Sequence, residues 1–313
     1  MDIRQIQYFI RVYEEGSFSR AAEKANVVQP ALSMQIRRLE EELTTPLFER
    51  SSRGIEPTPA GRRFYERCLP IVHGIAAARQ DIIEFVGGTR ISGAIHIGCP
   101  PSVNRGIIGD VLTRYADLYP DVEVTLTEGY SNALTALVQE GVLDAALAAK
   151  ASESSGLTST PTFEDRLLLV AGTAVNGDDL TPCRLTDMKE LKLILPSRRT
   201  LLGATIYDYI DSGIIRPKRV MHIDGVVATL ELARASDWSA IFPVVAMARE
   251  AGRQGLFVYP VVAPDMSFNL HLVHDRRRPL TAAMRALAEM IETRLREIRD
   301  VQAAFFPLPD QKA

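Results

Sequence analysis

The sequence predicts an α/β protein that begins with a small helical head, and three observations lead to this prediction. Three short helical patterns and then two short strand patterns occupy about the first 57 residues. One long helical pattern follows, and from Ile91 onward strand patterns alternate with helical patterns, which is typical of a parallel α/β sheet. We expect a head at residues 1–58, a linker helix at 59–88 and an α/β region at 89–313, divided into lobe I (about 91–161 and 266–300) and lobe II (about 162–265).

The composition excludes several classes of protein. A chain of 313 residues that is 46% hydrophobic and 24% charged is typical of a globular protein with about two domains. No run of about 18 apolar residues occurs, and the N-terminus lacks the continuous apolar stretch of an export signal, so we expect a cytoplasmic protein without membrane contact. The three cysteines, Cys68, Cys99 and Cys183, are spaced too widely for a disulfide framework or a zinc ribbon, so neither is expected. Because the net charge is −3, any contact with DNA must come from a local patch.

The first two helices of the head are short. Apolar residues from Ile3 to Tyr13 recur at helical spacing, and Gly16 ends the segment as a C-terminal glycine does. Ser17 or Ser19 can cap the second helix. Its small apolar face, which lets another helix approach closely, consists of Ala21, Ala22 and Ala25.

The third helix begins near Gln29-Pro30 and runs to about Leu43, with proline in the first turn where its missing N–H costs nothing. One face is apolar and consists of Leu32, Ile36, Leu39 and Leu43. The opposite face carries Pro30, Met34, Arg37 and Arg38, with Ser33 beside them. Because residues 46–57 predict a strand, a turn and a second strand, the head is expected to be a winged helix-turn-helix whose third helix enters the major groove of DNA.

A head of this kind contacts DNA through the free face of the third helix and through the hairpin. Gln29 and Ser33 are expected to reach base edges, whereas the arginines of the helix and hairpin meet phosphates. The full set of expected DNA-binding residues is Ser17, Ser19, Arg20, Gln29, Pro30, Ala31, Ser33, Met34, Arg37, Arg38, Arg50 and Arg53. The alternative is a small helical domain with a solvated polar face, because residues 1–60 contain eight Lys/Arg against nine Asp/Glu.

The linker helix starts at Thr58-Pro59, continues to about Val86 and is stopped by Gly87-Gly88. Apolar residues recur along it at alternating intervals of four and three, which is the seam of a helix that pairs with another helix. The expected dimerisation residues are Phe64, Cys68, Ile71, Ile75, Ala78, Ile82 and Phe85. The alternative is a helix packed on its own domain, and Pro70 is expected to kink the helix or to leave one hydrogen bond open.

The α/β region alternates strands and helices to its end. The expected strands are 94–98, 122–127, 143–148, 167–170, 191–195, 219–223, 240–242, 257–261 and 270–274. The expected helices are 105–118, 131–141, 200–212, 226–234, 244–251 and about 279–299. Two α/β halves of this kind leave a cleft between them, where strand ends face helix starts.

The head resembles the LysR-type transcriptional regulators. The residues that carry this resemblance are Gln5-Ile6-Gln7-Tyr8-Phe9, Gly16-Ser17-Phe18-Ser19-Arg20-Ala21-Ala22, Gln29-Pro30-Ala31-Leu32-Ser33, Ile36-Arg37-Arg38-Leu39-Glu40, Pro46-Leu47-Phe48-Glu49-Arg50 and Thr58-Pro59-Ala60-Gly61. The resemblance implies a winged helix-turn-helix, a long dimerising linker helix and a two-lobed effector domain like the type II periplasmic solute-binding proteins. It also implies a homodimer or a homotetramer that binds double-stranded promoter DNA and a small-molecule effector, with RNA polymerase as a further candidate partner.

Three residues depart from the family pattern. Val28 stands where a serine or threonine usually caps the recognition helix, so a capping hydrogen bond worth about 1 kcal/mol is replaced or forgone. Met34 occupies a position where a polar or basic residue is common. Thr44 replaces a frequent glycine at the end of the same helix, and this replacement is expected to alter the angle at which the chain enters the hairpin wing.

The resemblance places the effector between the lobes, against helix starts near residues 100 and 197. Backbone N–H groups at helix starts bind anions, Ser102, Ser197 and Thr200 add hydroxyl donors, and Arg198 can clamp a carboxylate or sulfonate, so an anionic effector is expected. The expected effector-binding residues are Pro101, Ser102, Val103, Gly129, Tyr130, Pro196, Ser197, Arg198, Thr200, Gly225, Val226 and Pro243. The alternative for Arg198 and Arg199 is a solvated loop pair.

The sequence contains no residues arranged for metal binding, hydrolysis or nucleotide binding. His271 and His274 lie three apart on an expected strand and point to opposite faces, so no metal site is expected, and no hydrolase or nucleotide-binding motif occurs. We expect neither a catalytic residue nor a cofactor, and we regard a solute-binding protein and an enzyme as the rival classes. The alternative function is a solute-binding or redox-sensing regulator with no anionic ligand, in which Cys99 is the candidate redox residue.

Overall fold

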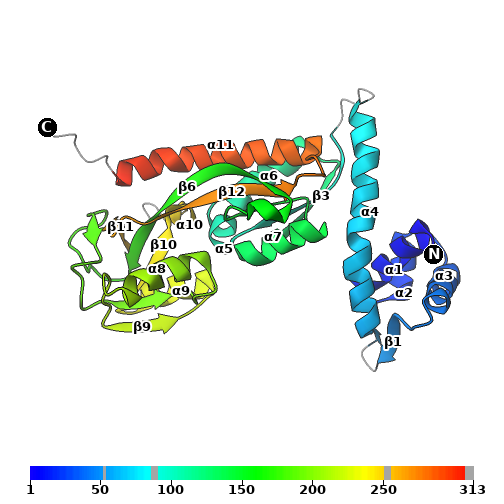
Figure 1. Ribbon diagram of the computed structural model, residues 1–313, viewed down its shortest axis with the longest axis horizontal. Helices are drawn as coiled ribbons and strands as arrows, with labels where there is room; N and C mark the ends of the chain where they lie inside the picture. Colours follow the sequence, from blue (N-terminus) through cyan, green and yellow to red (C-terminus); the bar gives the residue numbers. More distant parts are fainter. Residues whose placement is uncertain (52–53, 86–90, 250–254, 307–313) are drawn as a thin grey trace. The chain divides into compact units, whose positions relative to one another are not determined.

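The computed structural model of the chain describes residues 1–51, 54–85, 91–249 and 255–306 (Figure 1). These residues form two compact units, the first built on residues 1–89 and the second on most of the chain that follows. The first unit holds the head and the linker helix, and the second is the two-lobed α/β region.

The head contains three helices and a hairpin, as expected. They are α1 (Ile3–Glu15), α2 (Phe18–Lys24), α3 (Gln29–Glu42), β1 (Phe48–Ser51) and β2 (Gly54–Pro57), with β1 and β2 paired antiparallel. Gly16 ends α1 in the left-handed conformation at φ 56°, and Ser17, not Ser19, caps α2 by accepting the N–H of Arg20. Thr44 follows α3 at φ 51°, so a β-branched residue takes the left-handed conformation that usually calls for glycine.

The head buries one apolar core between its helices. Phe9 of α1 and Leu32, Ile36 and Leu39 of α3 are nearly inaccessible to solvent, as the spacing of apolar residues predicts. Phe9 makes an edge contact with Phe64 at a centroid distance of 5.0 Å, so the linker helix contributes to this core.

The linker helix is α4 (Pro59–Phe85), and it continues through Pro70. Thr58 precedes it and accepts the N–H of Gly61 at 3.0 Å. A side chain at Gly61 would bring a Cβ to 2.1 Å from the carbonyl oxygen of Leu47, so only glycine lets α4 start this close to the hairpin.

The expected seam along α4 divides into two parts. Cys68 is buried in the core of the head, so assigning it to a partner helix was wrong, and Phe64 packs half-buried against the same core. The physical reason is that the same face of α4 first covers α1. Further along, Ile71, Ile75 and Ile82 expose 50%, 50% and 60% of their surface, and Ala78 is also exposed. The side chain of Phe85 lies outside the described part of the chain.

The second unit contains the alternating strands and helices of the α/β region. In lobe I they are β3 (Gly93–Cys99), α5 (Pro101–Val103), a π-helical turn (Asn104–Ile108), α6 (Gly109–Leu118), β4 (Val122–Glu128), α7 (Ser131–Glu140) and β5 (Ala145–Ala148). From a short 3-10 turn (Glu153–Ser155) the chain passes into lobe II through β6 (Leu157–Ala171), β7 (Cys183–Arg184), β8 (Lys192–Leu195), α8 (Leu201–Asp211), β9 (Arg219–His222), α9 (Val226–Ala235), β10 (Ser239–Pro243), α10 (Val244–Met247) and β11 (Phe257–Ala263). It returns to lobe I through β12 (Ser267–Asp275) and α11 (Ala282–Phe305).

The sheet is mixed: the expected parallel strands are present within each lobe, and antiparallel strands join them. The strand order is β4-β3-β5-β12-β6-β10-β8-β9, and β11 pairs with β6. The strands β3, β4 and β5 pair parallel, as do β8, β9 and β10, but β12 pairs antiparallel with β5 and β6, and β10 pairs antiparallel with β6. The antiparallel strands occur where the chain passes from one lobe to the other and back.

Two strands, β6 and β12, carry the chain from lobe I to lobe II and back. In β6 the residues up to Arg166 pair with β12, and those from Leu167 onward pair with β10 and β11 (Figure 1). The helix α11 packs along β6.

Two helix bounds differ from the expected ones. The first helix of lobe I starts at Pro101 rather than at Arg105. The helix α10 ends at Met247 rather than at 251, and residues 250–254 lie outside the described chain.

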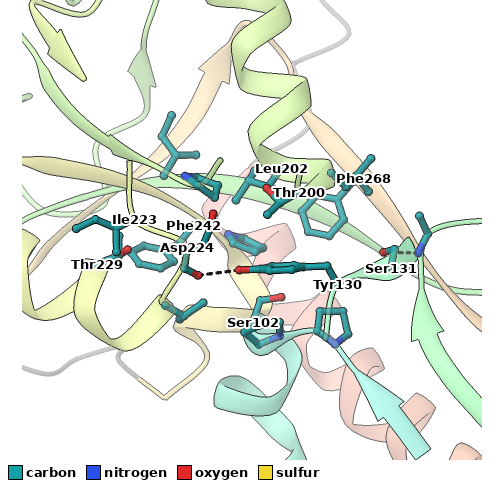
Figure 2. A pocket seen from close by; sticks show the side chains of 18 of the residues that line it. Ser102, Tyr130, Ser131, Thr200, Leu202, Ile223, Asp224, Thr229, Phe242 and Phe268 are labelled. Carbon is teal, nitrogen blue, oxygen red and sulfur yellow. Dashed lines mark hydrogen bonds between the residues drawn. The ribbon is translucent and has the colours of Figure 1, made fainter. Parts of the chain in front are cut away.

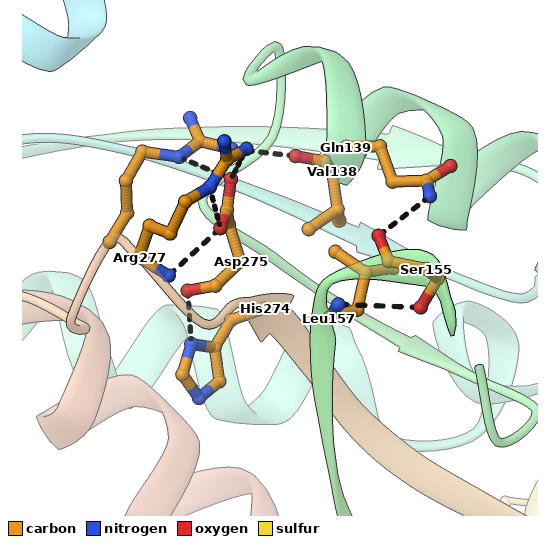
Figure 3. A network of polar contacts seen from close by, with 8 residues as sticks. Val138, Gln139, Ser155, Leu157, His274, Asp275 and Arg277 are labelled. Carbon is orange, nitrogen blue, oxygen red and sulfur yellow. Dashed lines mark hydrogen bonds and ion pairs between the residues drawn. The ribbon is translucent and has the colours of Figure 1, made fainter. Parts of the chain in front are cut away.

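The end of β12 is fixed by a buried carboxylate (Figure 3). Asp275 accepts the backbone N–H of Arg277 at 2.9 Å and the side chain of Arg278 at 3.3 Å. Arg278 also donates to the carbonyl oxygen of Val138 at 2.6 Å, which ties this turn to α7. Burial raises the pKa of Asp275, but the hydrogen bonds and charges of the two arginines outweigh it and leave the pKa lowered.

Candidate functional site

The free face of α3 has the composition of a surface that contacts another molecule. Gln29 and Pro30 are exposed, and Gln29 donates to the hydroxyl of Ser33 at 2.9 Å. Arg37 and Arg38 are exposed further along, with Arg37 Nε 3.1 Å from Glu41 Oε1. The polar and basic residues expected to contact DNA therefore lie together along one side of the helix.

The start of α3 lacks a side-chain cap. Val28 is the N-cap residue, makes no capping hydrogen bond and exposes 70% of its surface. The N–H groups of Ala31 and Leu32 both bond to the carbonyl oxygen of Val28, at 3.0 and 3.3 Å, which tightens the first turn. Met34 follows four residues after Pro30 and exposes 49%.

The remaining expected DNA-binding residues lie in different surroundings. Ser17 is occupied as the cap of α2, and Ser19 is exposed. Arg20 is exposed and donates to the carbonyl oxygen of Glu15. Ala31 is partly buried. The side chains of Arg50 and Arg53 lie outside the described part of the chain.

A cavity of about 100 Å³ opens between the lobes of the second unit (Figure 2). Seven of the twelve expected effector-binding residues line it, namely Pro101, Ser102, Tyr130, Pro196, Thr200, Val226 and Pro243. The other five do not line it: Val103 is buried in the core, Gly129, Ser197 and Gly225 each adjoin a lining residue in the chain, and Arg198 lies two residues from both Pro196 and Thr200. The cavity therefore lies where the resemblance places an effector.

Tyr130 and Asp224 join the two sides of this pocket. Tyr130 follows β4 in lobe I and donates its hydroxyl to the backbone oxygen of Asp224, which follows β9 in lobe II, at 2.8 Å (Figure 2). Burial raises the pKa of Tyr130, and the charges of Asp224 and Glu128 raise it further, so the hydroxyl keeps its proton and remains a donor. This hydrogen bond connects the two lobes at the pocket.

The pocket presents an acidic side chain and no basic one. Asp224 is the one charged residue among its described lining residues. Asp224 Oδ1 accepts the N–H of Ser197 at 2.7 Å, so this helix-start N–H group is already used. Thr200 likewise caps α8 by accepting the N–H of Gly203 at 2.9 Å and donates to the carbonyl oxygen of Ser197 at 3.1 Å.

The structure does not bring Arg198 to the pocket as a clamp. The Arg198 guanidinium is bidentate to Asp211, at 2.6 and 2.9 Å, and lies over the ring of Tyr207 at 4.0 Å from its centroid. It is 57% exposed, so its environment is close to the solvated alternative. Asp211 is at the end of α8, thirteen residues away, and folding of that helix brings the two charges together. The expected Arg198 clamp for an anion is corrected to a surface ion pair.

Most of the pocket wall is apolar, and the sequence did not indicate several of its residues. Fourteen of the twenty lining residues are apolar. Phe268 and Leu270 come from β12, and Thr229 comes from α9, one turn beyond Val226. The two-residue spacing of Phe268 and Leu270 places them on one face of a strand, which was the available signal. That this face borders the pocket depends on the crossing of β12 between lobes.

The three cysteines are buried thiols. Burial raises the pKa of Cys183 to about 12 and that of Cys68 to about 11. For Cys99, burial and the nearby charge of Glu128 raise the pKa to about 12. A thiol with such a pKa is protonated near neutral pH and reacts slowly, because the thiolate is the nucleophile.

The described residues contain neither the side-chain grouping of a metal site nor a helix that could span a membrane. Within residues 1–51, 54–85, 91–249 and 255–306, no group of three or more His, Cys, Asp or Glu side chains has the arrangement of a metal site. In the same part of the chain, no helix combines the length and hydropathy needed to cross a membrane.

Comparison with known proteins identifies relatives along the whole chain. The model of the bacterial regulatory helix-turn-helix protein, lysR family, matches residues 3–62, and that of the LysR substrate binding domain matches residues 88–296. The chain is 29% identical to the nitrogen assimilation regulatory protein nac of Klebsiella aerogenes, over 93% of this chain and 94% of that protein. It is 25% identical to the DNA-binding transcriptional dual regulator OxyR of Escherichia coli K12, over 94% and 96%. Among solved structures, full-length CbnR complexed with its target DNA has a TM-score of 0.64 at 22% identity, covering 94% of this chain and 99% of that chain.

Proposed function

Because this chain belongs to the LysR family of bacterial transcription regulators, we propose that it binds promoter DNA through the exposed face of α3 and responds to a small, largely apolar molecule that is not an anion. The helix-turn-helix head, the linker helix and the two-lobed effector domain are the parts of a LysR-type regulator. The proposal concerns which residues contact DNA and which class of molecule enters the pocket.

The composition of the pocket wall carries the proposal about the effector. A carboxylate or sulfonate that enters an apolar pocket loses its hydration, and without a cationic partner this loss costs several kcal/mol. The described wall offers no such partner, and Asp224 would repel a second negative charge. An uncharged molecule with an apolar body avoids both costs, and a hydrogen-bond donor on it would meet the Asp224 carboxylate.

The arrangement of the lobes supports a mechanism of regulation. The effector would contact lining residues of both lobes, such as Ser102 in lobe I and Thr229 in lobe II, and so favour one separation of the lobes over another. Such a ligand changes the affinity for DNA only if it binds one state more tightly, which is the thermodynamic condition for allostery. The Tyr130–Asp224 hydrogen bond joins the lobes at this pocket, so a ligand that changes the separation of the lobes must keep or break it.

A thermal-shift comparison of matched ligands tests the proposal. Aromatic and branched aliphatic carboxylates are compared with their carboxamides, alcohols and amines, using the full-length protein. A ligand at a hundredfold excess over its Kd adds about 2.7 kcal/mol, which raises Tm by several degrees. We expect shifts from uncharged or amine members and none from the carboxylates.

Two variants decide how such shifts are interpreted. Thr229→Leu fills the pocket and should abolish the shift, whereas Arg198→Ala, which removes a side chain outside the pocket, should leave it unchanged. A shift produced by carboxylates and lost in Arg198→Ala would overturn the proposal and restore the anion clamp.

A gel shift at several salt concentrations tests the DNA contacts. Binding through phosphates weakens steeply as salt rises, and Arg37→Ala should reduce both the affinity and this salt dependence. Ser33→Ala should weaken binding to the preferred sequence more than to unrelated DNA. If both variants bind like the parent, the assignment of the α3 face is wrong.

A further inference from the structure

The beginning of α3 carries an exposed apolar patch, defined here as Val28, Pro30 and Met34. Val28 exposes 70% and Met34 exposes 49% of its surface, and Pro30 is exposed. Pro30 and Met34 are four residues apart in one helix and so lie on the same side, while Val28 precedes the first turn. Pro30 and Met34 therefore lie at one end of the free face of α3, and Val28 directly precedes that end in the chain.

This patch does not serve the core of the head. The core side of α3 is supplied by Leu32, Ile36 and Leu39, which expose at most 1% of their surface. Val28 also forgoes the capping side chain that ordinarily stabilises the N-terminus of a helix. Exposed apolar side chains gathered at one end of a helix face are available for contact with another molecule.

The neighbours of the patch indicate what that molecule is. The hydrogen-bonded pair Gln29 and Ser33 borders it, and Arg37 and Arg38 lie exposed one to two turns beyond. In a helix-turn-helix protein the N-terminal residues of the recognition helix contact base edges, and basic residues contact phosphates. The patch is thus continuous with the DNA-binding face and occupies the part of it that meets the bases.

We infer that Met34, supported by Val28 and Pro30, reads the 5-methyl group of thymine in the major groove. The inference rests on the proposed role of α3 as the helix that contacts DNA. The thymine methyl is the apolar group that base edges present in the major groove, and apolar side chains recognise it there. Methionine is unbranched and flexible, so it can follow the methyl surface while the Gln29–Ser33 pair contacts a neighbouring base.

The experiment compares thymine with deoxyuridine, which pairs identically but lacks the methyl group. Duplexes bound by the full-length protein are selected from a randomised pool, and each thymine is then replaced singly by deoxyuridine. Affinities are measured by fluorescence anisotropy at constant salt. At the position read by the patch we expect about fourfold weaker binding, the effect of exposing one buried methyl group.

Three variants separate the contribution of the patch from general DNA affinity. Met34→Ala should bring the affinity ratio of thymine to deoxyuridine duplexes at that position to about one, and Met34→Leu should retain most of the discrimination. Arg37→Gln is the control, because the loss of a phosphate contact weakens both duplexes equally and lowers the salt slope by about one. Met34 is half exposed, so none of these effects requires the head to unfold.

Each other outcome has a defined meaning. If the protein selects duplexes but no position distinguishes thymine from deoxyuridine, or if Met34→Ala keeps the distinction, the inference is wrong and the proposed function stands. Light scattering tests whether a second copy of the chain covers the patch. If Met34→Ala lowers the molecular mass in solution and leaves the affinity ratio of thymine to deoxyuridine duplexes unchanged, a second copy covers the patch and the inference is also wrong. If no duplex is selected at low salt, the proposed function itself fails.

Discussion

The carboxylate of Asp165 accepts the backbone N–H of Val245 at 3.3 Å in a fully buried site. Asp165 lies on β6 directly before the residues where pairing passes from β12 to β10. Val245 belongs to α10, which follows β10 and packs on the π-helical turn of lobe I. One buried acid thus connects β6, which runs between the lobes, to the helix that follows β10.

The stability of the effector domain should fall with rising pH because of Asp165. Burial raises the pKa of this carboxyl well above its ordinary 3.8, although the N–H groups of Val245 and Val244 oppose the shift. Between pH 3.8 and the raised pKa the folded protein binds one more proton than the unfolded chain, so the free energy of unfolding decreases on the order of 1 kcal/mol per pH unit and levels off above the raised pKa.

Urea unfolding of the parent protein and of Asp165→Asn at successive pH values measures this slope. The variant has no titrating group at the site, so the free energy of unfolding of the parent should fall relative to that of the variant as pH rises through the window. Parallel curves for the two proteins would show that Asp165 does not titrate there.

Gly106 should not tolerate any side chain. A Cβ at this position would lie 1.9 Å from the carbonyl oxygen of Val245, so Gly106→Ala must push α10 away from the π-helical turn. We expect a loss of about 2 kcal/mol or more in the free energy of unfolding, as for an overpacked core.

Gly109→Ala is the matched control for Gly106→Ala, because its Cβ would meet only the flexible end of Arg249, at 3.0 Å. Chemical denaturation of both variants checks the prediction. Equal midpoints would mean that the contact between Gly106 and Val245 does not limit stability.

The exposed isoleucines of α4 should hold the oligomer together. Ile75→Glu places a charge in the apolar part of the linker helix, so we expect the mass in solution to fall toward the 34.6 kDa of one chain. Ala76→Glu, one residue away on a different side of the helix, should leave the mass unchanged. Light scattering at micromolar concentration distinguishes them, and an unchanged mass for Ile75→Glu would contradict the role of these isoleucines.

The three cysteine thiols of the folded protein should react slowly with peroxide and with other thiol reagents. The three cysteines are buried, and their raised pKa values keep them as thiols, so Ellman's reagent should label them slowly in the folded state and completely in urea. Ala76→Cys, which adds an exposed thiol, serves as the rapidly labelled control. Rapid labelling of Cys99, or DNA binding that changes with peroxide, would favour the redox-sensing alternative.

The sequence by itself determined the parts of this protein that depend on neighbours in the chain. The helices of the head follow from apolar residues at spacings of three and four, from Gly16 and from the cap at Ser17. The order of strands and helices in the lobes follows in the same way, because hydrogen bonds within a helix and alternation along a strand are local. Seven of the residues expected to bind an effector also line one cavity, since they stand near strand ends and helix starts.

Only the tertiary structure decided which distant residues meet. Arg198 pairs with Asp211 instead of facing the pocket, Cys68 packs in the head instead of on a partner helix, and β12 adds Phe268 to the pocket wall. Tyr130 and Asp224 are 94 residues apart in sequence and touch across the cleft. Such contacts depend on how strands cross between lobes and how a helix face is covered, and a periodic pattern shows that a face is apolar but not what will cover it.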